Sequence, residues 1–503
     1  SKALLRDMVR KNIIDEEFIN ELPTPYLNDV KKTKYENNKK LLNSHQISAV
    51  EKVNDSIRVK RSDCFLLDGV PGSGKTETYF ECVQTCLDEG KQVLILLPEI
   101  SLTPDWEERF YDKFYFKPLV WHSNISKNKK KEIWLSAITG SKCVVVGARS
   151  ALMLPFSHLG LIIVDEEHEP AFKQEETVRY NARDMAIYRA TKSSAPIILA
   201  SATPSLESYH NMKIGKYIHL NLPLRATGAE MPEINILDLK TDIPDKGRWI
   251  SPSLLMEIKS NLLKKEQTLL FLNRRGYAPI TICQACGFQV GCEKCDARMT
   301  LHSFRSILLC HQCGDTKPLI DVCPNCEASG SFNALGPGVE RIAEEASKVF
   351  PDAKLAILSS DILTPSGSID KIIDSIEKGE VDIIIGTQLV AKGHNFPHLS
   401  LVGVIDADLG LQGADLRASE KTFQLIKQVS GRAGRDKTKG IALLQTYQPE
   451  HPVITAILSD DDEKFWESEA KQRREALVPP FGTMAGIVIS GTDLQQVNEI
   501  SNQ

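Results

Sequence analysis

The sequence predicts an α/β protein with two doubly wound, parallel-sheet lobes, the second interrupted by a small cysteine-rich insert. Apolar runs of strand length recur along the chain and lead into glycine-rich or acidic segments, as buried parallel strands do at their carboxyl ends. One run precedes a complete phosphate-binding loop pattern. Eight of the 12 cysteines fall between Cys283 and Cys326, all in Cys-x-x-Cys pairs. A metal-binding insert is expected there.

Size and composition indicate several ordinary globular domains. The chain has 503 residues, of which 42% are hydrophobic and 25% charged, so it exceeds a single hydrophobic core. Its longest apolar runs fall well short of the ~18 residues of a membrane span, and no signal pattern follows Ser1. We therefore expect a cytoplasmic location without a membrane partner. The net charge of −5 excludes a polycation that coats DNA but is compatible with a local basic groove.

The apolar residues 65–68 lead into a nucleotide-binding loop. The loop consists of Gly69, Val70, Pro71, Gly72, Ser73, Gly74, Lys75 and Thr76. Its glycines allow backbone N–H groups to approach phosphates closely. We expect Lys75 to reach the β- and γ-phosphates and Thr76 to ligate Mg²⁺, at the start of a helix whose N-terminus favours anions. The predicted ligands are ATP and Mg²⁺.

A second apolar run, residues 159–164, ends in two acids. We expect Asp165 to hold Mg²⁺ and Glu166 to orient or deprotonate the attacking water. The alternative is a charged turn after a strand. Two acids at a strand's end, downstream of a phosphate loop, favour ATP hydrolysis over that alternative.

Further motifs follow in a fixed order. They are residues 201–204, 383–388, 392–396 and 428–435. The last contains Gln428, Arg432 and Arg435, which we assign to the catalytic set. Two arginines three apart at a helix start suit a γ-phosphate held by another lobe, where such an arginine is worth roughly 10³- to 10⁵-fold in rate. Alone, this pair would be weak evidence, since a surface helix cap has the same pattern; the ordered series carries the prediction.

In this order the motifs resemble those of superfamily 2 helicases, in which two RecA-like lobes clamp ATP. A narrower resemblance, to the primosomal protein N′ (PriA) family of replication-restart helicases, runs from about residue 42 to residue 481. It rests on residues 97–104, 147–152, 165–168, 271–279 and 386–394. The resemblance implies an ATP-dependent 3′→5′ DNA helicase that acts at stalled or collapsed replication forks, unwinds DNA and initiates primosome assembly.

The same resemblance implies the partners of the chain. They are forked and single-stranded DNA, the single-stranded-DNA-binding protein, and primosome or replicative-helicase loading proteins, bound by a nucleoid-associated monomer. The family usually has a further N-terminal domain, which binds the 3′ end of a nascent strand, and a longer C-terminal domain. Both are expected to be absent or cut short here, with the motor intact. Val339 stands where the family commonly has threonine, so a hydroxyl contact there would be lost.

Positions matching family motifs also suggest residue roles. Gln46 lies upstream of the phosphate loop, where helicases often use a glutamine to read adenine. In PriA-type helicases an aromatic-rich loop after the acidic motif senses DNA and transmits binding to the ATPase site. The DNA-coupling residues here are Phe172, Arg179, Tyr180, Arg183 and, from the later motif, Lys392. Aromatic rings and guanidinium groups suit stacking on unpaired bases, although Val178 stands where some relatives have tryptophan. The alternative is a surface loop with two incidental aromatics.

The eight clustered cysteines predict two Zn²⁺ ions. They are Cys283, Cys286, Cys292, Cys295, Cys310, Cys313, Cys323 and Cys326. Each Cys-x-x-Cys turn presents two thiolates, and two turns complete one tetrahedral site. Disulfides are disfavoured in a reducing compartment, and a redox pair does not need four copies. His302 and His311 are alternative ligands nearby.

Sequential and nested pairing of these turns are both compatible with the spacing, and the resemblance implies the nested one. Nested pairing joins the two inner pairs and the two outer pairs, so the outer cysteines close the base of the insert. Fully occupied Cys₄ sites leave no open position, so we expect structural zinc that supplies on the order of 10–16 kcal/mol per site to folding. In the family this module also supports unwinding and partner contacts.

The expected domain plan places the insert inside the second lobe. The segments are 1–41, a winged-helix remnant and linker; 42–222, the ATP-binding first lobe; 223–281, a linker and the start of lobe two; 282–327, the zinc module; 328–455, the rest of lobe two; and 456–503, the start of a truncated C-terminal domain. Two other classes of function are alternatives: a duplex-DNA translocase that does not separate strands, and a non-enzymatic scaffold that recruits partners through zinc. The insert and the intact catalytic motifs favour the helicase.

Overall fold

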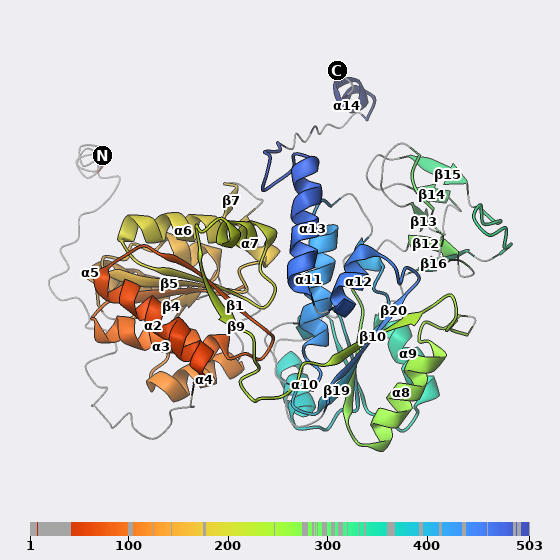
Figure 1. The fold of residues 1–503 in the computed structure, drawn as a ribbon, viewed down its shortest axis with the longest axis horizontal. Helices are drawn as coiled ribbons and strands as arrows, with labels where there is room; N and C mark the ends of the chain where they lie inside the picture. Colours follow the sequence, from red (N-terminus) through yellow and green to blue (C-terminus); the bar gives the residue numbers. More distant parts are fainter. Residues whose placement is uncertain are drawn as a thin grey trace. The chain divides into compact units, whose positions relative to one another are not determined.

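The chain folds into two compact units (Figure 1). The computed structural model describes Met8 and residues 42–501 except 99–103, 124, 142, 175–177, 246, 274–279, 284–285, 287, 289, 294–298, 303–306, 310–314, 319, 331, 336–338, 360–367, 392–395, 412–414, 435–438, 460, 486–488 and 490–493. The first unit comprises residues 1–67 and 75–200, and the second comprises residues 68–74 and 201–503.

A seven-stranded sheet has the strand order β3-β4-β2-β5-β8-β1-β9. Its strands are β1 (Cys64–Gly69), β2 (Gln92–Leu96), β3 (Leu119–Trp121), β4 (Val144–Gly147), β5 (Leu159–Asp165), β8 (Ile197–Ser201) and β9 (Ile218–Leu222). The strands from β3 to β8 pair in parallel. The central strands are almost wholly apolar because both of their faces are covered, with α3 and α6 on opposite sides in Figure 1.

The helices around this sheet are amphipathic or cap-defined segments. They are α2 (Ser44–Val59), α3 (Lys75–Asp88), α4 (Pro104–Phe114), α5 (Lys127–Thr139) and α6 (Ala182–Ser193). Short elements connect them: the 3₁₀ turns η1 (Arg149–Met153) and η2 (Pro170–Phe172) and the strands β6 (Lys173–Gln174) and β7 (Tyr180–Asn181). Four of the five helices follow a strand and return the chain to the sheet, which produces the parallel order.

A six-stranded parallel sheet has the order β10-β20-β19-β11-β18-β17. Its strands are β10 (Glu233–Asp238), β11 (Gln267–Phe271), β17 (Leu355–Leu358), β18 (Ile383–Gly386), β19 (Leu399–Val404) and β20 (Ile441–Thr446). Side chains alternate between its faces: Leu269 and Phe271 enter one hydrophobic cluster, and Leu270 enters another. Because both clusters are apolar, the sheet needs helices on each side.

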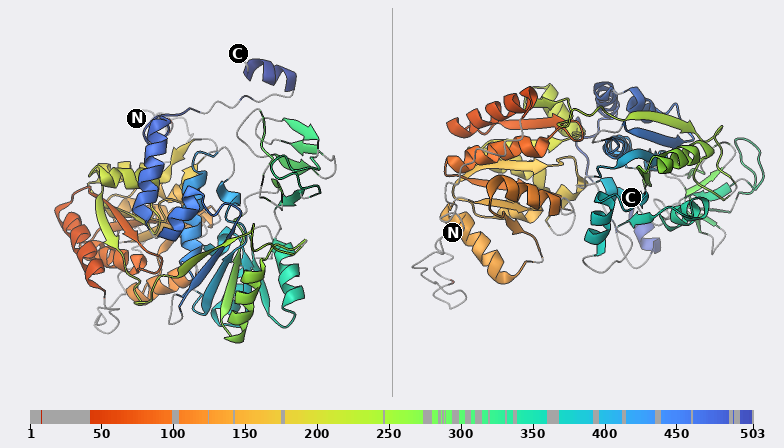
Figure 2. Two further views of the ribbon diagram at one scale, coloured as in Figure 1. Left: turned by 45° about the vertical axis from the view of Figure 1, so that its right-hand side comes forward. Right: turned by 90° about the horizontal axis from the view of Figure 1, so that it is seen from below.

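Helices cover both faces of this second sheet (Figure 2). The helices of the second unit are α7 (Leu206–Lys213), α8 (Pro252–Leu263), α9 (Val339–Val349), α10 (Ser368–Glu377), α11 (Ala418–Ser430), α12 (Pro452–Ser459), α13 (Asp462–Glu475) and α14 (Leu494–Ser501), with the 3₁₀ turns η3 (Gln388–Ala391) and η4 (Leu409–Leu411). Helix α11 packs in one cluster through Phe423, and α8 packs in the other through Leu254. The predicted α/β class with two parallel-sheet lobes is confirmed.

A small antiparallel sheet forms the cysteine-rich insert, in the order β15-β14-β13-β12-β16. Its strands are β12 (Ile280–Cys283), β13 (Thr300–His302), β14 (Ile307–Leu309), β15 (Thr316–Pro318) and β16 (Phe332–Leu335). Its buried apolar cluster consists of Val290, Met299 and Leu308 among the described residues. A core this small does not stabilise a domain without a further constraint.

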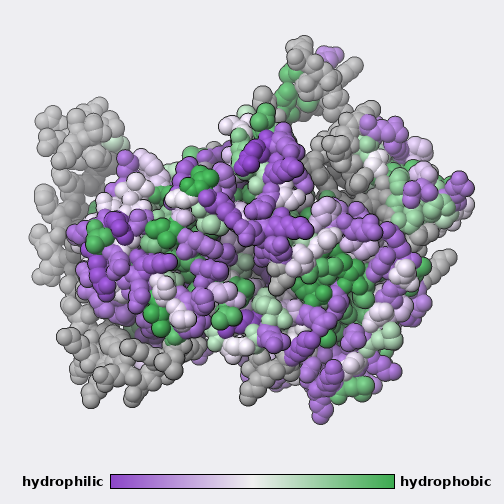
Figure 3. All heavy atoms as spheres, in the orientation of Figure 1, coloured by the Kyte–Doolittle hydropathy of each residue, from purple (hydrophilic) through white to green (hydrophobic). Residues whose placement is uncertain are grey.

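The face drawn in Figure 3 is mostly hydrophilic, with scattered hydrophobic side chains and one more extended hydrophobic area in the right half of the view. Within the part of the chain that the structure describes, no helix combines the length and the apolar character needed to cross a bilayer.

Candidate nucleotide site and metal centre

The phosphate loop connects β1 to α3 and has the backbone that its glycines predict. Gly72 and Gly74 have φ values of +83° and +78°, in the left-handed region where a side chain is unfavourable. The Ser73 N–H donates to the carbonyl of Val70 at 3.0 Å, which closes the turn. Helix α3 begins at Lys75, so the first N–H groups of the helix and its positive dipole end lie at the end of the loop. The loop is therefore built to receive phosphate.

Asp165 ends β5 with both carboxylate oxygens engaged. Oδ1 accepts the backbone N–H of Glu166 at 3.0 Å, and Oδ2 accepts the hydroxyl of Tyr79 at 3.0 Å. Burial and the nearby charge of Glu166 together raise the pKa of Asp165 to about 6, although Lys75 and the Tyr79 hydroxyl act in the opposite direction. A carboxylate held in a low-dielectric position next to another acid is stabilised by a cation.

Glu166 has an uncommon backbone conformation for a residue with a side chain. Its φ is +50°, which costs roughly 1–2 kcal/mol for a residue other than glycine. The turn is held by the Glu169 N–H, which donates to the Glu166 carbonyl at 2.8 Å, and by the Glu167 N–H, which donates to Ala200 at 3.1 Å. Backbone strain that is held in this way is typical of functional sites.

The residues present fit a magnesium ion. The Asp165 carboxylate accepts a hydrogen bond from the phenol of Tyr79, which lies one helical turn after Thr76 on α3, so two oxygen donors lie near the start of α3. Mg²⁺ prefers hard oxygen ligands and is bound by one or two protein groups together with the substrate's phosphates. Thr76 and Asp165 are the residues that would hold it.

Gln46 lies at the start of α2 and takes part in a capping box. Its side-chain oxygen accepts the Asn43 N–H at 2.8 Å, and its own N–H donates to the Asn43 side chain at 3.0 Å. The side chain of Gln46 is buried. In this structure its carbonyl oxygen therefore serves the helix N-terminus, and the adenine contact stays a prediction.

The arginine motif follows α11 in the second unit. Arg432 is buried in the turn after the helix, and Gln428 lies in the last turn of α11. A Cβ added to Gly431 would meet Pro71 of the phosphate loop at 2.6 Å, and both residues belong to the second unit. Glycine is therefore required at position 431. Arg435 lies outside the described residues.

Arg225 links this turn to the chain next to the phosphate loop, and sequence reasoning missed it. Its guanidinium donates to the carbonyls of Gly431 at 2.8 Å and Gly434 at 2.6 Å. The next residue, Ala226, donates its N–H to the Gly72 carbonyl at 2.9 Å. No sequence pattern marks Arg225, because its partners lie about two hundred residues away in the chain.

Replacing Arg225 with alanine is expected to lower the free energy of unfolding by about 3 kcal/mol, since buried carbonyls that lose a donor cost about 1–3 kcal/mol each. Lysine should restore only part of this, because an ammonium lacks the planar fork of guanidinium. Urea unfolding measures the change. The control is Arg341→Ala, at an exposed position on α9. An Arg225→Ala variant as stable as that control would contradict the assignment.

The DNA-coupling residues divide into buried and accessible ones. Phe172 is buried, and so is Arg183, which donates to Glu167 at 3.0 Å and to Asp184 at 2.9 Å. Arg179 is exposed, and Tyr180 is half-buried on β7, which pairs with β6 in a short hairpin. Of the DNA-coupling residues that the structure describes, Arg179 and Tyr180 thus offer accessible surface for stacking on bases. Lys392 lies outside the described residues.

The Arg183–Glu167 pair ties α6 to the acidic motif, and Arg183→Met should be strongly destabilising. The Glu167 side chain is fully buried, and removing one partner of a buried ion pair costs about 3–5 kcal/mol. Thermal or urea unfolding measures the loss. The double variant Arg183→Met with Glu167→Gln should recover part of the stability. Equal losses in the single and double variants would contradict a paired charge.

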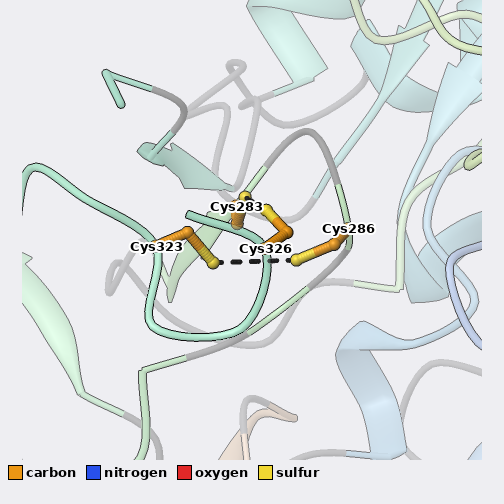
Figure 4. A group of neighbouring side chains, drawn as sticks. All are labelled: Cys283, Cys286, Cys323 and Cys326. Carbon is orange, nitrogen blue, oxygen red and sulfur yellow. Dashed lines mark hydrogen bonds between the residues drawn. The ribbon is translucent and has the colours of Figure 1, made fainter. Parts of the chain in front are cut away.

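The outer cysteines meet in one cluster (Figure 4). The Sγ atoms of Cys283, Cys286, Cys323 and Cys326 all lie within 4.8 Å of one another. Cys283 is 3.6 Å from Cys326, and Cys286 is 3.7 Å from Cys323. Zn–S bonds of about 2.3 Å in a tetrahedron place sulfurs about 3.8 Å apart, so these four thiols fit zinc and are too far apart for disulfides.

This grouping is the one that nested pairing implies for the outer cysteines. Cys283 ends β12 and donates its N–H to the carbonyl of Phe288, while the Cys323 N–H donates to the carbonyl of Ala328. Of the inner four, Cys292 is described and its thiol lies 3.9 Å from Asp315. Cys295, Cys310, Cys313 and His311 lie outside the described residues, as does the side chain of His302.

A second acidic pair follows β19 and was also missed. Asp406 accepts the N–H groups of Asp408 and Leu409, each at 3.0 Å. Burial and the charge of Asp408 raise the pKa of Asp406 to about 7. The signal was present in the sequence, since an apolar run ends in acids here as it does at Asp165.

Comparison with known proteins agrees with this architecture. Residues 43–212 match the DEAD/DEAH box helicase family, residues 337–437 match the helicase conserved C-terminal domain, and residues 292–318 match the PriA DNA helicase Cys-rich region domain. RecG bound to a three-way DNA junction superposes with a TM-score of 0.52 at 14% identity, covering 100% of this chain and 52% of RecG. The helicase MrfA bound to DNA gives 0.51 at 14% identity, covering 85% and 51%. These two likenesses show the fold.

Sequence relatives show the family. The replication restart protein PriA of Rickettsia conorii is 44% identical over 474 residues, which cover 94% of this chain and 72% of that protein. PriA of Bacillus subtilis is 39% identical over 492 residues, covering 97% and 60%. The two helicase domains and the cysteine-rich region occur together here as in PriA. The chain therefore belongs to the PriA family of replication restart proteins and is a helicase with ATPase activity.

Proposed function

We propose that the chain is an ATP-dependent 3′→5′ DNA helicase that acts at stalled or collapsed replication forks, unwinds DNA and initiates primosome assembly. The observation that carries the motor is the hydrogen bond between the Asp165 carboxylate and Tyr79, on the helix that begins with Lys75 and Thr76, beside a phosphate loop of the required shape. The fork and the polarity rest on the resemblance to PriA. The DNA named in the structures of RecG and MrfA supports a nucleic-acid substrate.

In the proposed reaction the chain's residues position the phosphates and the water. Lys75 and the N–H groups of the loop neutralise the β- and γ-phosphates, and Glu166 orients or deprotonates the attacking water. Mg²⁺, when bound with ATP, neutralises charge on the phosphates. Arg432 and Arg435 stabilise charge on the transferred phosphoryl group, with Gln428 in the same motif.

DNA binding is coupled to this site through the segment that follows the acidic motif. We assign surface contact with bases to Arg179 and Tyr180, which are accessible, together with Lys392. Phe172 and Arg183 are buried and contribute without contacting DNA. Arg183 donates a hydrogen bond to Glu167, the residue after Glu166. A shift of the hairpin would thus be transmitted to the acidic turn through one buried ion pair.

The proposal includes two zinc ions and the domain division into 42–222 and 223–455, with the zinc module at 282–327. The outer four cysteines fit one ion, and the remaining four would hold the second. Forked and single-stranded DNA, the single-stranded-DNA-binding protein and helicase-loading proteins are the proposed partners of a nucleoid-associated monomer.

Strand displacement on partial duplexes tests the proposal. We expect ATP-dependent release of a strand whose displacement requires 3′→5′ movement on the longer strand, and no release from a partial duplex with the opposite overhang. ATP hydrolysis and movement along duplex DNA without strand separation would favour a translocase. Strand release with the opposite polarity would overturn the direction proposed here.

A further inference from the structure

A buried phenol contacts the carboxylate that we assign to magnesium. Tyr79 is fully buried on α3. Its hydroxyl donates to Oδ2 of Asp165 at 3.0 Å. Tyr79 lies three residues after Thr76 and four after Lys75, so helical periodicity brings all three to one face of α3. That face is directed at the carboxyl end of β5.

The direction of the Tyr79 proton follows from its other neighbour. The indole Nε1–H of Trp106 lies 3.0 Å from the Tyr79 oxygen. Indole nitrogen only donates, so the phenol oxygen accepts this bond. The one proton of the phenol is then available to the Asp165 carboxylate. Because Oδ1 of Asp165 accepts the Glu166 N–H, both ends of the carboxylate are held and its plane is fixed.

Trp106 is itself held firmly, because α4 is anchored to α3. Two ion pairs cross between these helices: Arg109 with Glu77 at 2.6 Å, and Lys113 with Glu81 at 2.5 Å. Between them lies an aromatic cluster, in which the Phe80 ring contacts Trp106, Phe110 and Phe114 with centroids 5.5–5.6 Å apart. Aromatic contacts of this kind resist displacement of either helix.

We propose that Tyr79, oriented by Trp106, is a positioning residue that holds Asp165 in the orientation that binds magnesium with the nucleotide. This rests on the roles proposed above for Thr76 and Asp165. Tyr79 does not touch the phosphates in this role; it acts through the carboxylate. Its loss should therefore weaken the response to Mg²⁺ and leave the affinity for nucleotide alone unchanged.

The test measures binding of a fluorescent ADP analogue to the full chain, first with EDTA and then across a Mg²⁺ titration. For Tyr79→Phe we expect unchanged affinity in EDTA and a rise of about tenfold in the Mg²⁺ concentration that gives half of the metal effect, the size of one hydrogen bond to a charged group. Trp106→Phe should raise the same Mg²⁺ concentration by about threefold, since the phenol remains but the indole no longer directs its proton to Asp165. This second variant provides the test if Tyr79→Phe does not fold.

A packing variant separates positioning from general damage. Ile133→Ala removes a buried apolar side chain from α5, outside the aromatic cluster that holds Trp106, so it should lower the melting temperature and leave the Mg²⁺ half-point unchanged. An unchanged half-point in Tyr79→Phe, or an equal shift in Ile133→Ala, overturns the proposal. Asp165→Asn identifies the source of a failure. If it abolishes the Mg²⁺ response while Tyr79→Phe does not alter it, only the role of Tyr79 fails; if Asp165→Asn has no effect, the proposed metal site fails as well.

Discussion

Replacing Lys75 with alanine is expected to reduce DNA-stimulated ATP hydrolysis by about 10³-fold. Lys75 starts α3 at the end of the phosphate loop, and it is the side chain that the loop supplies to the β- and γ-phosphates. Removing one pre-positioned charge or donor from a developing charge typically costs 10²- to 10³-fold in rate, and an ammonium on a transferred phosphoryl group belongs at the upper end. Steady-state phosphate release with single-stranded DNA and Mg²⁺ measures the effect.

The matched control is Lys259→Ala, the same change at an exposed position on α8, which should leave the rate unchanged. Binding of single-stranded DNA should survive in the Lys75→Ala variant, because the substitution removes a phosphate contact and leaves the hairpin with Arg179 and Tyr180 intact. A variant that hydrolyses ATP within tenfold of the wild-type rate would show that the phosphate loop is not the catalytic site.

Loss of the outer metal site is expected to unfold the cysteine-rich insert. Zinc contributes an apparent 10–16 kcal/mol or so to small domains of this kind, and the described apolar core of the insert comprises only Val290, Met299 and Leu308. Cys323→Ser should therefore open the insert to proteolysis between β12 and β16. The two parallel sheets have their own cores and should stay folded.

Zinc content and protease digestion measure this outcome together. With nested pairing, Cys323→Ser lowers bound zinc by one ion per chain, and the fragments begin or end inside the insert. Cys82→Ala is the control: it removes a buried thiol from α3, outside the cluster, and should leave the zinc content unchanged. A Cys323→Ser insert that keeps all its zinc and resists protease would contradict the outer Cys₄ site.

The parts of the site that are local in sequence were predictable. The phosphate loop needs glycines at fixed positions, and the observed φ values of Gly72 and Gly74 match that need. The acids after β5 were predictable because an apolar strand must end where polar residues begin. Cysteine turns could be recognised for the same reason, since two thiols three apart need only one turn to come together.

Features that depend on distant partners could not be predicted. Whether Arg183 is buried depends on Glu167, and a lone arginine in a loop is normally a surface residue. Arg225 acquires its role from carbonyls at Gly431 and Gly434. The predicted adenine contact of Gln46 competes with a local role in helix capping. Asn43 and Gln46 have the spacing of a capping box, and in the structure the side-chain oxygen of Gln46 accepts the Asn43 N–H.

Because β12 pairs with β16, the cysteine-rich insert could be deleted from the chain without interrupting either parallel sheet. In the register of these two strands, Cys283 lies directly opposite Phe332. The chain therefore leaves β12 and enters β16 at neighbouring positions about 5 Å apart. A short hairpin turn could bridge that gap, and closing a shorter loop costs less entropy than the native one. A protein shortened in this way would retain every described residue of both parallel sheets.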